Sequence, residues 1–244
     1  MAVVMLFLGI SLLLGGCGGK TVVRDEGPFD AEKSMARAEQ LLQDKEYDEA
    51  RRLLIEIKNR DTSRKYSSQA QLKIADSHVQ EGDPEVGIAE YKRFLEMYPE
   101  GQYASYAQYQ IAMAYFTQIE SPDRGSGAAE KALGEFLILK ERYPRNPYRE
   151  ILDLRIEKCR NVIADGEFIV GEFYYRKGSY QAALNRWEKL LRSFPAYKKA
   201  DETLLLIGQA YRNLKMEDKA REAFETLIRQ FPSSPFVAEA KKQL

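Results

Sequence analysis

The sequence predicts an all-α protein built as a solenoid of five helix pairs, with one long helix joining an N-terminal half to a C-terminal half. Two observations lead to this prediction. Apolar residues recur with the spacing of amphipathic helices from residue 30 to the end, and strand signals are almost missing. In addition, an aromatic residue is followed by proline, which cannot continue a helix, at Tyr98-Pro99, Tyr143-Pro144, Phe194-Pro195 and Phe231-Pro232.

Residues 1–16 predict a signal peptide. The apolar run from Val3 to Leu14 carries no charge, and it is too short for a transmembrane helix but fits the central region of a signal peptide. A Leu-Gly-Gly-Cys sequence that ends at Cys17 resembles the processing site of bacterial lipoproteins, in which the cysteine is acylated. The Lys or Arg that normally opens a signal peptide is missing. A simple anchor helix with an incidental cysteine is the alternative.

Residues 17–29 are expected to hold the lipid-bearing Cys17 and a flexible linker, because they contain glycines and a proline but no helical period. Gly18 follows the cysteine. Where lipoproteins are sorted, Asp at this position holds them at the inner membrane, so Gly18 indicates the outer membrane, with the protein facing the periplasm. Each buried acyl methylene contributes about 0.8 kcal/mol, so two or three acyl chains would make the attachment permanent.

Residues 30–146 are predicted to form three helix pairs of the tetratricopeptide (TPR) type, whose pattern is W-x₂-L-G-x₂-Y, then A-x₃-F, then a closing proline. The second pair carries Gly87, Tyr91 and Pro99 at pattern positions. The third pair contains eight extra residues, which form a polar loop around residues 120–127. The first pair fits at its apolar positions but lacks the closing proline.

Residues 147–244 are predicted to form a connecting helix and TPR repeats four and five. In the connecting segment, Leu152, Ile156, Cys159 and Ile163 are spaced by four, three and four residues. This spacing indicates an amphipathic helix, which we expect to run straight into the first helix of repeat four.

Small residues mark the expected helix contacts within repeats four and five. Gly171 and Gly208 lie 37 residues apart, and so do Ala183 and Ala220. We expect the glycines to lie where the paired helix comes closest, with the alanines opposite, because a larger side chain would overpack these positions.

A solenoid of helix pairs exposes a concave face that is lined by the first helices. On this face the third repeat presents an aromatic and apolar set, to which the second repeat adds two aliphatic residues. Exposed aromatics with a methionine are typical of peptide-binding surfaces. The alternative is that Tyr109 and Phe116 only pack against the neighbouring helix. The candidate peptide groove consists of Tyr106, Tyr109, Met113, Phe116, Leu72 and Val79.

The composition argues against several functional classes. Lys plus Arg and Asp plus Glu both number 37, so no net charge attracts a nucleic acid. Cys17, Cys159 and the single histidine, His78, do not have the spacing of a metal site. His78 takes a position that tyrosine occupies in other repeats, and Cys159 lies on an apolar stripe, so both are expected to pack. We expect neither an enzyme nor a bound cofactor or metal.

The whole arrangement resembles the BamD family, the TPR lipoproteins of the outer-membrane β-barrel assembly machinery. The resemblance rests on the lipoprotein cysteine, the linker, the five repeats, the connecting helix and the loop insert in repeat three. Residues 168–184 (FIVGEFYYRKGSYQAAL) are also similar to the fourth repeat of that family. The resemblance implies an outer-membrane lipoprotein scaffold that helps to assemble and insert β-barrel proteins.

The resemblance also implies partners. In that family the C-terminal repeats dock on the POTRA domains of the barrel-forming subunit, and other assembly lipoproteins join the complex. The N-terminal repeats are thought to receive the C-terminal strand of unfolded barrel clients, which typically ends in an aromatic residue. Two other TPR envelope proteins remain alternatives: a pilotin lipoprotein that helps a secretin to assemble, and the periplasmic coordinator of the Tol-Pal system. The coordinator is normally soluble and begins with a coiled coil, whereas this sequence has Cys17 and no heptads.

Overall fold

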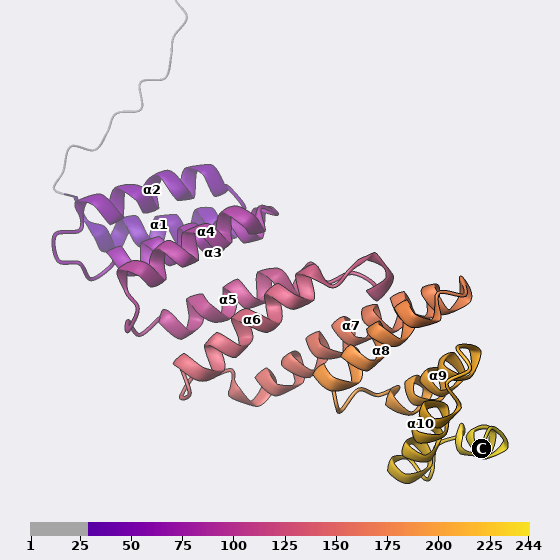
Figure 1. Cartoon of the computed structure of the whole chain (residues 1–244). Helices are drawn as coiled ribbons and strands as arrows, with labels where there is room; N and C mark the ends of the chain where they lie inside the picture. The colour runs from indigo at the N-terminus through magenta and orange to yellow at the C-terminus, as the bar shows by residue number, and fades with distance from the viewer. Residues whose placement is uncertain (1–28) are drawn as a thin grey trace, which may run out of the picture. The chain divides into compact units, whose positions relative to one another are not determined.

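The computed structural model describes residues 29–244, and the predicted signal peptide, Cys17 and most of the linker lie outside this range. Ala31–Leu244 form one compact unit of helices (Figure 1). Among the described helices, none has the length and apolar character needed to span a membrane. The elements are α1 (Ala31–Gln43), α2 (Tyr47–Arg60), α3 (Ser67–Glu81), α4 (Pro84–Met97), α5 (Ala104–Thr117), η1 (Pro122–Arg124), α6 (Gly127–Arg142), α7 (Arg149–Arg176), α8 (Tyr180–Ser193), α9 (Ala200–Asn213), α10 (Glu217–Gln230) and α11 (Val237–Lys242).

The long helices form pairs in chain order, and each helix packs against the next one along the chain. The pairs are α1 with α2, α3 with α4, α5 with α6, α7 with α8, and α9 with α10. The short helix α11 packs on α10. Between residues 29 and 244 the chain contains no strand. The predicted all-α solenoid of five TPR-like pairs is therefore confirmed.

The aromatic-proline steps end the second helices of four pairs. Tyr98, Tyr143, Phe194 and Phe231 are the C-cap residues of α4, α6, α8 and α10. A residue before proline is kept out of the α-helical conformation by steric clash. The four caps accordingly have ψ angles of 56° to 68°, which stop each helix at the place that the sequence indicates.

The first pair has no closing proline, and a carboxylate closes it instead. Asp61 follows α2 and is only 8% exposed. Its side chain accepts hydrogen bonds from the backbone N–H groups of Ser63 (3.1 Å), Tyr66 (2.6 Å) and Ser67 (3.2 Å). Burial alone would raise the pKa of Asp61, but the hydrogen bonds from these residues outweigh burial and hold the pKa below its usual range.

The glycines at the expected helix contacts lie against large rings. A Cβ atom on Gly171 would clash with the Trp187 ring of α8, and one on Gly208 would clash with the Phe224 ring of α10. A side chain at either position would therefore push the two helices of the pair apart. The alanines four residues before these rings, Ala183 and Ala220, are both buried.

Helix α7 is 28 residues long, whereas α6, the next longest, has 16. As predicted, the connecting helix and the first helix of repeat four are one continuous element. Leu152, Ile156 and Cys159 in its first half belong to a core shared with α6. Phe168 in its second half belongs to a core shared with α8. The two neighbouring helices thus pack on different halves of α7.

The loop insert of the third pair contains η1 and packs against α7. The contact lies at Gly166, near the middle of α7, where a Cβ atom would lie 3.4 Å from the carbonyl oxygen of Pro122. The insert therefore rests on α7 where the half that packs on α6 meets the half that packs on α8.

Candidate peptide-binding residues on the first helices

The six candidate groove residues lie on α3 and α5, and the structure divides them between two cores. Leu72, Val79 and Tyr106 border the core between α3, α4 and α5. Leu72 is only 4% exposed, whereas the other five are partly exposed. The residues that border the next core, between α5, α6 and α7, are Tyr109, Met113 and Phe116.

Tyr106 and Leu72 belong to a pocket of about 330 Å³ between α1, α3 and α5. In this pocket Asp76 accepts hydrogen bonds from the hydroxyls of Tyr106 (2.8 Å) and Tyr91. Burial raises the pKa of Asp76 despite these bonds. Val79 points elsewhere and fills the space beside Gly87. The pocket lining consists of Glu39, Gln69, Leu72, Lys73, Asp76, Tyr103 and Tyr106.

Tyr109 and Phe116 do pack against neighbouring helices, as the alternative interpretation has it. The Tyr109 ring stacks on Tyr148, with centroids 3.7 Å apart and 5° between the ring planes. Phe116 meets Phe136 edge to face at a centroid distance of 5.8 Å. The rings of Tyr109 and Phe116 nevertheless remain partly exposed, so a ligand can still reach them.

Two cations of α7 lie over these rings, and the sequence had not singled them out. The Arg155 guanidinium lies 5.7 Å from the Tyr109 centroid and 5.1 Å from the Phe116 centroid. The Lys158 ammonium lies 5.4 Å from the Phe116 centroid. The Nε of Arg155 is buried without a hydrogen-bond partner among residues 29–244. The spacing of Tyr148, Arg155 and Lys158 marks one helix face, but it does not reveal that this face meets α5.

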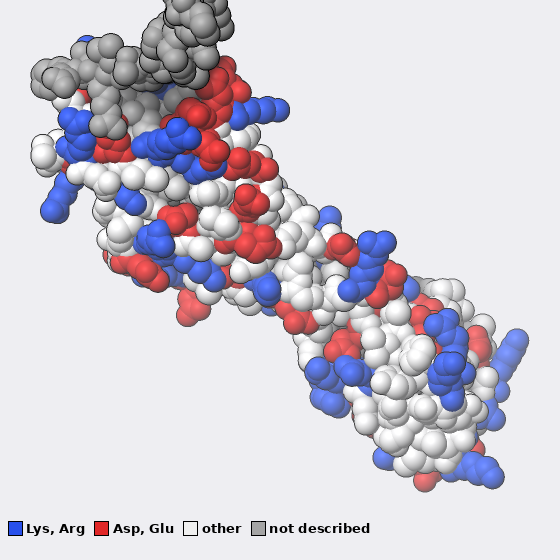
Figure 2. Space-filling view, turned by 90° about the horizontal axis from the view of Figure 1, so that it is seen from above, with Lys and Arg blue, Asp and Glu red and all other residues white. Residues whose placement is uncertain are grey.

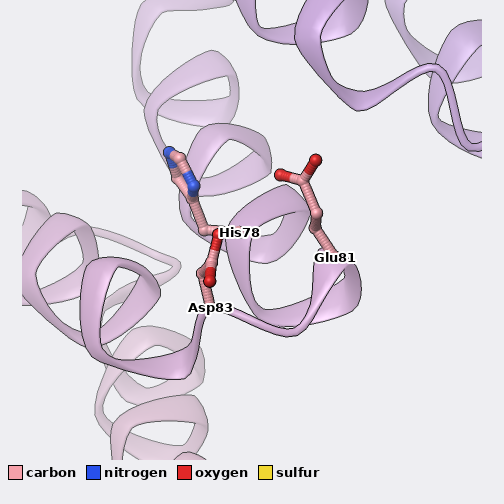
Figure 3. Close-up of side chains that lie close together, drawn as sticks. All are labelled: His78, Glu81 and Asp83. Atoms are coloured by element: carbon pink, nitrogen blue, oxygen red, sulfur yellow. The ribbon is translucent and has the colours of Figure 1, made fainter.

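His78, Glu81 and Asp83 form the one group in the described chain whose potential metal-ligand atoms lie within 4.8 Å of one another (Figure 3). The Glu81 carboxylate is already paired with the Arg51 guanidinium at 2.6 Å, and Asp48 holds the same guanidinium at 2.5 Å. A metal ion at this place would compete with Arg51 for the Glu81 carboxylate. The arrangement therefore favours a network of ion pairs over a metal centre.

Cys159 is fully buried in the core between α6 and α7. Burial raises the pKa of its thiol to about 11, so the thiol is protonated at neutral pH. A nucleophilic cysteine must be a thiolate and must be accessible. Cys159 therefore offers no covalent chemistry at this position.

Charges of both signs cover the surface together. Figure 2 shows Lys and Arg interspersed with Asp and Glu over the visible face. Some of these charges join neighbouring first helices, as the pair Lys73–Glu39 does at 2.9 Å between α3 and α1. The face seen in Figure 2 therefore shows no continuous basic patch of the kind that phosphate recognition uses.

Comparisons with known proteins find related chains along nearly the whole sequence. The family model "YfiO: Outer membrane lipoprotein" matches residues 30–225. The outer membrane protein assembly factor BamD of Neisseria meningitidis serogroup A is 25% identical over 251 residues, which cover 97% of this chain and 94% of the relative. BamD of Caulobacter vibrioides is 25% identical (96% and 78% covered), and BamD of Vibrio cholerae is 26% identical (86% and 90% covered).

Among solved structures, one that is similar is the TPR2AB domain of yeast Sti1 in its complex with a pHSP90. The alignment covers 87% of this chain and 83% of the Sti1 chain, at 15% sequence identity and a TM-score of 0.48. The fold assignment rests on the helix pairs themselves.

Proposed function

Because the chain belongs to the YfiO family of outer membrane lipoproteins, we propose that it is a scaffold that helps to assemble and insert β-barrel proteins into the outer membrane. The observation that carries the proposal is the end-to-end match with BamD assembly factors. The TPR-like pairs also favour a scaffold over an enzyme, since stacked helix pairs present extended surfaces to other proteins.

The proposal includes a lipid anchor at Cys17, with the protein held at the outer membrane and facing the periplasm. The Leu-Gly-Gly-Cys sequence, Gly18 after it and the description of the family as lipoproteins support this placement. Replacing Cys17 by Ser should abolish incorporation of labelled palmitate and move the protein from the membrane to the soluble fraction. A Cys17→Ser protein that keeps the label and stays with the membrane would contradict the anchor.

The proposed receiving surface for unfolded β-barrel segments is the face of α5 that carries Tyr106, Tyr109, Met113 and Phe116. Aromatic faces can accept the apolar side chains of an extended segment. The charged groups of Arg155 and Lys158 lie over the rings and add hydrogen-bond donors beside them. The surface thus combines apolar contact with a hydrogen-bonding cation, which suits a peptide.

The proposed partner of the C-terminal repeats is a POTRA-bearing outer-membrane barrel protein, with other assembly lipoproteins in the same complex. Val170 and Phe173 of α7 support this placement, because their side chains are 36% and 51% exposed. Exposed large apolar side chains on a folded surface mark contact sites for other proteins when they lie together.

Depletion of the protein in its native host tests the proposed function. We expect the amounts of all outer-membrane β-barrel proteins to fall together, because a general assembly factor serves every client. Loss of a single secretin alone would indicate a pilotin instead. Purification of the full-length protein from detergent-solubilised membranes should also bring down a POTRA-bearing barrel protein in near-equal amount, and its absence would contradict the proposal.

A further inference from the structure

An Arg–Lys pair of α7 lies beside the aromatic side chains of α5. Arg155 and Lys158 are three residues apart, so their side chains are neighbours on one face of the helix. The Arg155 guanidinium lies over the rings of Tyr109 and Phe116, and the Lys158 ammonium lies over the ring of Phe116. Two like charges at this spacing repel each other. A carboxylate bound between them would therefore be attracted by both.

The chain contains a second Arg–Lys pair with the same spacing, and that pair binds a carboxylate. Arg186 and Lys189 of α8 both contact Glu167 of α7, at 3.1 Å and 3.4 Å. By contrast, no carboxylate of the described chain lies within ion-pair distance of Arg155 or Lys158. No Asp or Glu stands three or four residues before or after either of them. Arg155 and Lys158 thus have the spacing of a carboxylate-binding pair without a carboxylate partner among the described residues.

The rings beneath Arg155 prepare its guanidinium for a ligand. A planar guanidinium that stacks on aromatic faces loses little further freedom when it binds. Its Nε is buried, whereas its two terminal nitrogens are neither buried nor hydrogen-bonded within residues 29–244. These two nitrogens can donate side by side to the two oxygens of one carboxylate. The exposed ammonium of Lys158 adds a third donor beside them.

Exposed apolar side chains border the two cations. Ile151 is 42% exposed and Leu154 is 66% exposed. Together with Arg155 and Lys158 they fall within about 100° around the axis of α7. On the other side of the cations, the ring of Phe116 is partly exposed. A ligand whose carboxylate is bound by the pair would therefore find apolar surface directly beside that carboxylate.

We propose that Arg155 and Lys158 bind the free carboxylate at the C-terminal end of a received segment, whose last side chain is apolar and lies against Leu154 or Phe116. A terminal residue carries its carboxylate and its side chain on one Cα atom, so it can contact the cations and the apolar surface together. An internal Asp or Glu would need a second residue for the apolar contact. The inference rests on the proposed function for the source of the segment, and it makes the receiving surface selective for chain ends.

Three labelled peptides test this assignment on the full-length protein in detergent. They share one sequence that ends in phenylalanine, with a free carboxylate, with a terminal amide, or with two further glycines that move the carboxylate away from the ring. Fluorescence anisotropy should show that the free acid binds at least about tenfold more tightly than the other two, which equals about 1.4 kcal/mol. Added salt should reduce this preference, because it screens charges at the surface. Equal affinities for the free acid and either other peptide would overturn the inference.

Two substitutions and a matched control assign the preference to the pair. Arg155→Gln and Lys158→Gln should each lower the ratio of the acid affinity to the amide affinity, and the double variant should bring this ratio to about one, because no cation remains for the carboxylate. The ratio is informative because a loosened fold would weaken both peptides alike. The control replaces Arg186 and Lys189 by Gln, which removes an Arg–Lys pair already bound to Glu167. An unchanged ratio in the double variant, or an equal loss in the control, would overturn the inference.

The outcomes separate this inference from the proposed function. Peptides that bind equally well with and without the free carboxylate, in cells whose β-barrel proteins still depend on the protein, would overturn the inference alone. A preference for the free acid that disappears in the double variant, in cells whose β-barrel proteins do not depend on the protein, would overturn the proposed function alone. Failure of all three peptides to bind would overturn the receiving surface and the inference together. Circular dichroism of each variant would verify that the fold is intact.

Discussion

At the scale of single residues, a buried carboxylate replaces a proline. Asp61 ends the first helix pair, where the aromatic-proline step of the later pairs is missing. Its oxygens bind three backbone N–H groups at the start of the next pair. The turn from α2 to α3 is therefore held by charge-assisted hydrogen bonds, which depend on the ionised form of Asp61.

Asp61→Ala should lower the free energy of unfolding by about 1–3 kcal/mol, because it leaves the backbone donors of Tyr66 and the buried Ser67 without an acceptor. The pKa of Asp61 is lower in the folded than in the unfolded state, so its contribution is present above the unfolded pKa. It is lost as the pH falls through the folded pKa. Urea unfolding of wild type and variant at pH 7 and in acid would check this expectation. A difference that does not shrink in acid, or an equal effect of the exposed control Asp44→Ala, would contradict it.

Gly208→Leu should lower the free energy of unfolding by about 1–3 kcal/mol or more, because the new side chain would overlap the Phe224 ring. Gly134→Leu is the matched control, since it makes the same change in an open position of another helix. The control should be neutral or stabilising by up to about 1 kcal/mol, owing to helix propensity. Thermal unfolding followed by circular dichroism measures both. Equal Tm values for the two variants would refute the packing role of Gly208.

At the scale of elements, α5 contributes side chains to two hydrophobic cores. Its aromatic and apolar stripe, Tyr106 to Phe116, could be predicted from the helical period alone. The sequence could not predict that Tyr106 borders one core while Tyr109 and Phe116 border the next. That arrangement depends on partners that are distant in sequence: Asp76 binds Tyr106 across 30 residues, and Tyr148 stacks on Tyr109. Arg155 was missed for the same reason, since only the packing of α7 on α5 and α6 brings it over the rings.

Tyr109→Ala should weaken the binding of a synthetic peptide that copies the C-terminal strand of a β-barrel protein. We expect about a tenfold loss of affinity, because a central aromatic contact is removed. Fluorescence anisotropy of the labelled peptide would measure it. The control is Phe173→Ala, which removes an exposed aromatic outside the proposed receiving surface. Equal losses in the two variants would argue against the α5 face as the peptide site.

Val162→Pro should interrupt α7 between its two halves, at a cost of about 3 kcal/mol or more for a proline inside a helix. Because the neighbouring helices pack on different halves, we expect the single cooperative unfolding transition to split into two. Differential scanning calorimetry would reveal the split, with Val162→Ala as the control for loss of the side chain. One sharp transition in Val162→Pro would mean that the halves remain coupled without a continuous helix.

At the scale of the whole described unit, strong contacts run from each helix to the next along the chain. Such serial packing explains why the sequence predicts the fold so well. Helix ends at Tyr98, Tyr143, Phe194 and Phe231, and the glycines beside large rings, are local signals. The groove between α2 and α4, which is lined by Arg51, Ile55 and Arg93, was not predictable, because the position of one second helix relative to another depends on how both pack on the helix between them.

Because α7 is one unbroken helix, the number of residues between its two halves fixes the orientation of α8 relative to α6. A residue inserted into a helix rotates everything beyond it by about 100° and shifts it by about 1.5 Å. One residue added to α7 between its two halves would thus rotate α8, α9 and α10 about the axis of α7 relative to α6. One residue added to the loop around η1 would be absorbed there. A naturally occurring relative could therefore vary freely in the loop, but α7 could change length only in steps that restore its phase, such as a full heptad.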